Sequence, residues 1–419
     1  MNGCDPKLGR GYGNWVVGDQ FYDRKIELEL FAELMHQGAN LLVVAPRRIG
    51  KTSLLRESER RLQKKYLCLQ VDLQKANSPA DAILELGLAT RPHLPIWSRF
   101  LGLFSNLLDQ IAGRVQSLKK SDVTVALRAG INPGNWQNKG DRLLELISRS
   151  ERPVIIFLDE LPILITKILK GSDFKITPER RDTAESLMSW IRSSSIRYQG
   201  KVRFVIAGSV GLRPVLQQAG LNATLNNFQA FPLGAWTADT AASFISEIAA
   251  ENDLVLDGDV PTRMTELLGA CIPHYVRMFF ENVYRVAKLE APGAMSVARV
   301  EEIYRNDMLG IRGRTELSHF EERLRLLGPE FYDVAFEILT EAAAVGEVSL
   351  VTAEGLASEH AVEGRSAMAL TREALGILEH DGYLKEVGLS LYAFDSKLVR
   401  DWWRASYGKG FKCLKERSK

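Results

Sequence analysis

Short apolar runs alternate with helical patterns over the first half of the chain. Five runs are apolar enough to be buried strands of a parallel sheet. They are the segments 41–45, 66–73, 153–160, 202–209 and 228–235. Between them, apolar residues recur at helical spacing over 21–36, 51–63, about 79–118 and 179–195. Strands alternating with helices predict an α/β fold, in which a five-stranded parallel sheet carries helices on both faces.

The pattern changes after residue 236 and becomes helical up to about residue 310. Further on, helical stretches precede two short β-type runs, 383–387 and 390–394, separated by Gly388-Leu389, which predicts a hairpin. Three helices followed by a hairpin are the outline of a winged helix. We therefore expect an N-terminal extension (1–20), an α/β core (21–236, with a helical insertion at about 79–118), a helical domain (237–314), a winged-helix domain (315–407) and a basic tail (408–419).

The first strand leads into a turn that carries Gly-Lys-Thr and opens a helix, which is the layout of a phosphate-binding loop. Main-chain N–H groups of such a turn hold phosphates together with the helix N-terminus. Gly50 allows close approach of the backbone, Lys51 supplies the charge that assists catalysis, and the Thr52 hydroxyl suits Mg²⁺. The usual first glycine of the loop is an alanine here. The expected nucleotide-binding residues are Ala45, Pro46, Arg47, Arg48, Ile49, Gly50, Lys51, Thr52 and Ser53.

Two adjacent carboxylates, Asp159 and Glu160, follow the buried strand 153–158. Ligands of open α/β sheets bind at this carboxyl end of the strands. We expect Asp159 to hold Mg²⁺ with Thr52, and Glu160 to polarise the water that attacks the γ-phosphate. The alternative is a strand that merely ends in solvated acids. The cofactors predicted are ATP or ADP with Mg²⁺.

A second nucleotide motif points to GTP but lies in the wrong place. Asn138-Lys139-Gly140-Asp141 matches the pattern that reads guanine, yet it precedes the acidic strand, and no apolar strand comes before it. We interpret 132–140 as a loop that leads into a helix, and we expect ATP rather than GTP.

Several motifs in this order resemble the archaeal-type ATPases of the STAND class, within or beside the AAA+ ATPases. The motifs are Phe21-Tyr22-Asp23-Arg24, Ala45-Pro46-Arg47-Arg48-Ile49-Gly50-Lys51-Thr52-Ser53-Leu54-Leu55, Phe157-Leu158-Asp159-Glu160, Ile206-Ala207-Gly208-Ser209 and Cys271-Ile272-Pro273. The resemblance covers most of residues 20–405. It implies a P-loop ATPase core, a helical lid over 237–314 and a C-terminal winged helix.

The resemblance also implies roles for residues outside the loop. Ser209 would be the sensor of the γ-phosphate, although a hydroxyl at a strand end is often a cap. Pro273 would pack on adenine, or would simply begin a helix. Tyr22 and Arg24 would lie on the adenine side, although Arg24 can equally be a surface charge. Arginine fingers that act on a neighbouring subunit could come from Arg180, Arg181 or Arg192.

Composition is that of an ordinary soluble globular protein, with 46% hydrophobic and 25% charged residues. The net charge of +2 predicts no bulk attraction to nucleic acid or membrane. The four cysteines are scattered without Cys-x-x-Cys spacing, which argues against zinc or a disulfide framework and favours the cytoplasm. We find no signal-peptide pattern at the N-terminus, and no apolar run approaches the length of a membrane span.

Two functions remain open. The first is an ATP-dependent switch that acts through a separately encoded protein effector or sensor, by analogy in a prokaryotic stress or anti-phage system, with a homo-oligomer as an option. The second is a DNA-binding AAA+ ATPase resembling origin-recognition or transposition helpers.

Charge favours the first function, because residues 315–404 carry a net charge of −9, the tail 405–419 carries +4 and residues 1–314 carry +7. A catalytically dead scaffold and a small-molecule kinase are weaker alternatives, since Glu160 is present and no acceptor motif is found.

Overall fold

The computed structural model describes residues 8–105, 120–208, 211–290, 293–325, 328–360 and 366–417. The chain forms two compact units. One comprises residues 24–44 and 54–233 and contains the five-stranded sheet. The other comprises residues 1–23, 45–53 and 234–419. The loop that follows the first strand therefore belongs to the second unit.

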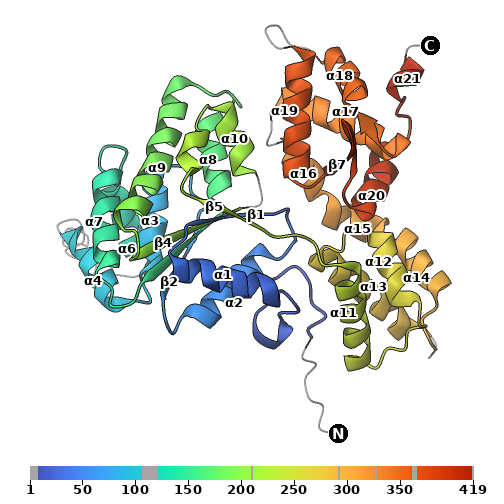
Figure 1. Ribbon diagram of the computed structural model, residues 1–419, viewed down its shortest axis with the longest axis horizontal. Helices are drawn as coiled ribbons and strands as arrows, with labels where there is room; N and C mark the ends of the chain where they lie inside the picture. Colours follow the sequence, from blue (N-terminus) through green and yellow to red (C-terminus); the bar gives the residue numbers. More distant parts are fainter. Residues whose placement is uncertain are drawn as a thin grey trace. The chain divides into compact units, whose positions relative to one another are not determined.

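The sheet is entirely parallel, with the strand order β2-β3-β4-β1-β5 (Figure 1). Its strands are β1 (Leu41–Val44), β2 (Leu67–Asp72), β3 (Val154–Asp159), β4 (Val202–Gly208) and β5 (Gln229–Pro232). All five correspond to the apolar runs of the sequence, so the predicted α/β sheet is confirmed. Because all strands run the same way, their carboxyl ends meet at one edge.

Helices cover both faces of the sheet, as predicted (Figure 1). Helix α1 (Lys25–Gln37) packs Phe31 on Phe157 of β3, and α2 (Lys51–Leu62) contacts the same face through Glu59 and Gln70. The opposite face builds a large apolar core, and four helices contribute most of its helical residues. These are α3 (Pro79–Ala89), α7 (Trp136–Ser148), α8 (Leu161–Lys170) and α9 (Pro178–Arg197).

Shorter elements complete this unit. They are α4 (Leu94–Gly102), α6 (Lys120–Gly130), α10 (Leu212–Gln218) and the 3-10 helix η2 (Asn222–Leu225). The predicted insertion 79–118 is helical where described, and its residues 106–119 lie outside the described part.

The predicted loop over 132–140 is wrong in its second half, because α7 already begins at Trp136. Gly140 was interpreted as a loop residue, but it lies inside the helix and faces Trp190 of α9. A Cβ there would lie 2.7 Å from the indole ring. The glycine thus permits close packing of two helices, and its neighbour Asp141 accepts a hydrogen bond from Trp190 at 2.9 Å. The guanine-like motif is therefore part of a packed helix.

The second unit continues after residue 233 with a helical segment. Its elements are α11 (Ala238–Glu251), α12 (Val260–Leu268), α13 (Pro273–Leu289), α14 (Val297–Ile303), the π-helix η3 (Tyr304–Met308) and α15 (Ile311–Leu317). Before the loop, the described chain contains the 3-10 helix η1 (Gly18–Gln20).

The C-terminal part has the winged-helix arrangement. It contains α16 (His319–Arg325), α17 (Pro329–Val345), β6 (Val348–Ser349), α18 (Leu350–Glu359), α19 (Ala367–His380), β7 (Leu384–Gly388), β8 (Leu391–Phe394), α20 (Lys397–Tyr407) and α21 (Leu414–Arg417). The antiparallel order β6-β8-β7 confirms the predicted hairpin. Trp402 and Trp403 of α20 are fully buried and form part of its core.

The basic tail packs on the acidic winged helix. Arg417 pairs with Glu337 at 2.7 Å and with Glu359, and the Leu414 N–H donates to Glu341 at 3.1 Å. Part of the positive charge of the tail is therefore engaged within the chain. None of the helices in the described ranges is both long and apolar enough to cross a membrane.

Candidate functional site

The loop after β1 is closed by its own lysine. Lys51 is the first residue of α2 and is buried, and its ammonium donates to the carbonyl oxygens of Ala45 at 2.6 Å and Pro46 at 2.7 Å. These bonds join the two ends of the segment 45–51. Within it, Arg48 has φ 69° and Gly50 has φ 99°. Left-handed residues in a turn before a helix arrange successive N–H groups into an anion-binding concavity, and this geometry suits phosphate.

The acidic pair lies at the carboxyl edge of the sheet. Strand register places Asp159 of β3 beside Ala207 of β4, which in turn lies beside Val43 of β1, the strand that enters the loop. Glu160 adopts φ 57° before α8, and its N–H donates to Asp159 Oδ1 at 3.1 Å. Both side chains are partly exposed. A left-handed glutamate carries local backbone strain, which often marks functional positions.

A third carboxylate at this edge escaped the sequence analysis. Asp72 ends β2 and pairs in register with Asp159. From the sequence, 66–73 is predicted only as a buried strand. Its acidic residue Asp72 is visible there but is assigned no role. The carboxylates of Asp159 and Asp72 are hard oxygen donors of the kind that Mg²⁺ prefers. The chemistry at this edge of the sheet therefore suits the predicted metal.

Other residues of the loop make contacts within the second unit. The Ser53 hydroxyl accepts a hydrogen bond from the Val16 N–H at 3.1 Å, which ties the N-terminal segment to the start of α2. Ile49 is buried. Ser209, the expected sensor, lies outside the described residues.

The expected adenine-side residues fall in two places. Tyr22 donates to Glu247 of α11 at 2.7 Å and packs edge-on against Trp236 and Phe244. Arg24, in the other unit, is buried and pairs with Glu27 at 2.7 Å, so it is not a surface charge.

The lid residue Pro273 begins α13, as the alternative interpretation expected. Just before it, the Trp236 N–H donates to the Cys271 carbonyl at 3.0 Å, in an isolated antiparallel bridge. Pro273 therefore lies two residues after Cys271, whose bridge to Trp236 joins the start of the lid to the segment just before α13.

Arg277 is a buried cation near Tyr22 that sequence reasoning missed. Its guanidinium donates to the carbonyls of Gly9 and, at 2.9 Å, Gln20, and it lies over the Phe244 ring at 4.8 Å. Burial lowers the pKa of Arg277 to about 10. It fastens the N-terminal segment to the lid. In the sequence, the one indication of this role is that Arg277 lies among apolar residues of the helix 273–289.

The loop also contacts the lid and the winged helix. Arg48 pairs with Glu316 of α15 at 3.5 Å, and His274 Nε2 lies 3.6 Å from the same carboxylate. Burial lowers the pKa of His274 to about 3, and the Arg48 charge acts in the same direction. Burial also lowers the pKa of His319 to about 3, against the effect of its hydrogen bond to the Glu316 backbone. Both imidazoles are therefore neutral at physiological pH.

A glycine of the winged helix meets the loop directly. Gly382, in the turn between α19 and β7, has φ 75°, and a Cβ there would lie 2.5 Å from Cγ of Pro46. Next to it, Asp381 forms a buried ion pair with Arg323 of α16 at 3.2 Å. The turn at Gly382 therefore packs closely against Pro46 of the loop 45–53.

Two of the three candidate arginine fingers are engaged within their own unit. Arg180 pairs with Asp173, and Arg181 pairs with Glu185 at 3.1 Å. Arg192 lies on the same helix, α9, and is half-buried.

Among solved structures, a Walker-type ATPase of Pyrococcus abyssi is similar over nearly the whole length of both chains. The similarity covers 94% of this chain and 99% of that protein, at 16% identity and a TM-score of 0.62. The chain shares its fold with an archaeal Walker-type ATPase.

Two structures from Aeropyrum pernix are less similar. They are ORC1 in complex with DNA (17% identity, TM-score 0.42, covering 92% of each chain) and ORC2 with ADPNP and ADP (12%, 0.49, covering 91% of this chain and 93% of that one). Of these three similarities, the one to the Pyrococcus protein is close enough to establish a common fold. No family model and no curated protein matches the sequence.

Proposed function

We propose that the chain binds Mg-ATP at the loop 45–53, hydrolyses it slowly and acts as a STAND-like molecular switch. The proposal is supported by a lysine-closed loop between β1 and α2. It is also supported by carboxylates at the same edge of the sheet that β1 reaches. The fold of a Walker-type ATPase agrees with it.

Each residue would have one task. The Lys51 ammonium would neutralise charge on the phosphates, and Thr52 with Asp159 would hold Mg²⁺, which offsets the charge of the nucleotide. The Glu160 carboxylate would accept a proton from water as it attacks the γ-phosphorus. The oxygen of that water forms the new P–O bond, and ADP leaves with the electrons of the broken bond.

The switch is inferred from one observation, the contacts of the loop 45–53. The loop contacts the winged helix where Pro46 meets Gly382, and the lid where Arg48 pairs with Glu316. Phosphate bound in the loop would compete with Glu316 for Arg48. A nucleotide state could therefore favour one arrangement of the winged helix over another by its different contacts in the two states. The output would pass to a separately encoded protein partner, by analogy in a prokaryotic stress or anti-phage system.

The test of this proposal is ATP binding. Lys51→Ala removes the counter-charge of several phosphate oxygens, so we expect calorimetry to detect Mg-ATP binding by the native chain and none by the variant. Arg61→Ala is the control, because this exposed arginine of the same helix pairs with Glu57 of α2. Equal affinity in the Lys51→Ala variant would reject the loop as the nucleotide site.

A further inference from the structure

Within the described part of the chain, strand β2 lies at one end of the sheet and has a strand neighbour on one side only. Its pairing with β3 uses alternate residues: the Leu67 N–H donates to Pro153 and the Leu73 N–H to Asp159, both at 2.9 Å. In a parallel pair the main-chain groups of intervening residues point away from the neighbour. Those of Cys68 and Gln70 therefore face outward. A strand edge of this kind is a template for a further strand.

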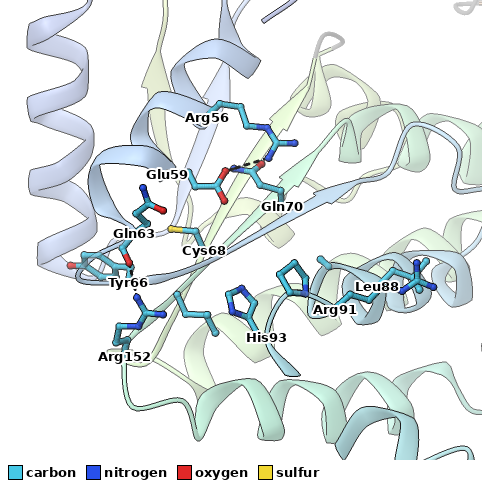
Figure 2. A pocket seen from close by; sticks show the side chains of 13 residues that line it. Arg56, Glu59, Gln63, Tyr66, Cys68, Gln70, Leu88, Arg91, His93 and Arg152 are labelled. Atoms are coloured by element: carbon cyan, nitrogen blue, oxygen red, sulfur yellow. Dashed lines mark hydrogen bonds and ion pairs between the residues drawn. The ribbon is translucent and has the colours of Figure 1, made fainter. Parts of the chain in front are cut away.

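A cavity of about 610 Å³ lies along this edge. Helix α2 forms one wall with Arg56, Glu59 and Gln63, and the end of α3 with the turn that follows it (88–93) forms the other. Figure 2 shows Arg56, Glu59 and Gln70 gathered on one side of the strand, with Arg152 and His93 on the other. An extended segment can enter between two such walls, whereas the flat edge of a second folded sheet cannot approach as closely.

The residues that line the cavity favour a negatively charged segment. Glu59 is already occupied, because it accepts from Arg56 at 3.3 Å and from Gln70 at 3.1 Å. Arg152 donates to the Gln63 carbonyl at 2.6 Å, and no carboxylate of the described residues lies within ion-pair distance of it. A guanidinium in this position can bind a carboxylate in a bidentate manner.

A third arginine at the cavity contributes less. The side chain of Arg91 turns away from the strand in Figure 2 and donates to Thr124 at 2.8 Å. The charge available to a ligand is therefore centred on Arg152.

His93 partly shields the edge. Burial lowers the pKa of its imidazole, although a hydrogen bond with the Cys68 main chain acts against that shift. Burial raises the pKa of the Cys68 thiol to about 12, so this cysteine is a neutral group and no nucleophile at physiological pH. A side chain that covers a main-chain group is one way in which proteins protect a free edge.

We propose that the outer edge of β2 is a docking site for an extended, acidic segment of a partner protein. The segment adds to the sheet beside β2 through main-chain hydrogen bonds with Cys68 and Gln70, and it places a carboxylate on Arg152. Strand addition of this kind takes affinity from the backbone and specificity from side chains on alternate positions. Docking here does not depend on nucleotide binding.

The experiment selects binders of the full chain from a random peptide library displayed on phage. We expect the recovered peptides to carry Asp or Glu and to slow amide exchange at Cys68 and Gln70 when bound. Arg152→Glu should weaken these peptides by about tenfold or more and should favour versions in which the acid is replaced by Lys. Arg149→Glu is the matched control, because this exposed arginine lies outside the cavity and pairs with Glu145, and it should leave affinity unchanged.

His93→Ala provides a second variant that does not depend on charge. Removing the imidazole frees the Cys68 main chain, so the same peptides should bind several-fold more tightly. Failure to recover any acidic peptide would overturn the proposal, as would binding that leaves exchange at Cys68 and Gln70 unchanged. Protection that grows with protein concentration in the absence of peptide would assign the edge to a second copy of the chain instead.

Discussion

Asp159 and Glu160 are adjacent but are expected to act differently. Glu160→Gln keeps the shape of the side chain and loses the base, so we expect Mg-ATP affinity close to that of the native protein and phosphate release about 10²–10⁴-fold slower. Asp159→Asn should instead raise the Mg²⁺ concentration needed for half-maximal binding. Calorimetry and a phosphate-release assay on both variants measure these effects. Native turnover in Glu160→Gln would place the base on another residue.

The two buried histidines predict a dependence of stability on pH. His274 and His319 have pKa values of about 3 in the folded chain, against about 6.5 for an unfolded histidine. The folded state then binds fewer protons below about pH 6.5, so their contribution is complete above that pH and is lost as pH falls toward 3. At about pH 5 we expect a loss of roughly 2 kcal/mol per histidine in the free energy of unfolding.

Denaturant titrations between about pH 7.5 and pH 5 measure this loss. His274→Gln should flatten the dependence by about half, since one of the two protonation penalties disappears. His36→Gln is the control, because His36 is exposed on α1 and should leave the slope as it is. Equal slopes in all three proteins would contradict the buried, neutral state of His274.

At the scale of elements, a partly exposed ion pair between Arg48 and Glu316 joins the loop 45–53 to α15. Glu316→Gln removes the partner of Arg48, so we expect faster amide exchange over 45–50 and over the turn at 380–383, with ATP still bound. Glu322→Gln, on the neighbouring helix α16, is the matched control, because Glu322 is exposed and its carboxylate accepts a hydrogen bond from the Ser318 hydroxyl. If both variants exchange like the native chain, the ion pair does not couple the loop to the winged helix.

The elements themselves could be predicted where the signal is local. The strand 153–158 is apolar without interruption, and the hairpin at 384–394 has a turn between two β-type runs, so both were found within a few residues. Helix α7 began earlier than predicted, because Gly140 was interpreted through its usual role in loops. Position 140 requires a glycine because a side chain there would meet the Trp190 ring of α9, a helix that lies much further along the chain.

At the scale of the whole molecule, the sequence could predict which residues form the loop but not what surrounds them. The pairs Tyr22–Glu247, Arg48–Glu316 and Pro46–Gly382 join positions hundreds of residues apart, and no periodicity in one sequence encodes them. The same is true of the cavity at β2, which depends on sheet order. The phosphate loop and acidic pair were accessible because their chemistry is carried by contiguous residues.

The charge of residues 315–404 argues against duplex DNA as a ligand of the winged helix. Helix α19 is the helix that would enter a DNA groove, and it exposes Arg372. The region that contains it, residues 315–404, nevertheless carries a net charge of −9. The wing ends in Leu389, which is 99% exposed and apolar, and Arg417 of the tail is paired with Glu337. This region therefore offers no net positive charge to phosphates, and phosphate neutralisation supplies most of the affinity for DNA.

We therefore expect the winged helix to contribute no DNA contact. Any binding of duplex DNA by the full chain at about 0.15 M salt should then come from the positively charged remainder, and it should stay in the micromolar or weaker range of non-specific contacts. A mobility-shift titration with the native protein, Arg372→Glu and the control Arg404→Glu measures this, since Arg404 is exposed on α20, a different helix of the winged-helix region. All three proteins should behave alike. Tight binding by the native chain that Arg372→Glu abolishes and Arg404→Glu retains would put α19 in the groove. That result would make the DNA-binding ATPase the better description, because a switch that acts only through a protein partner gives no reason for such selectivity.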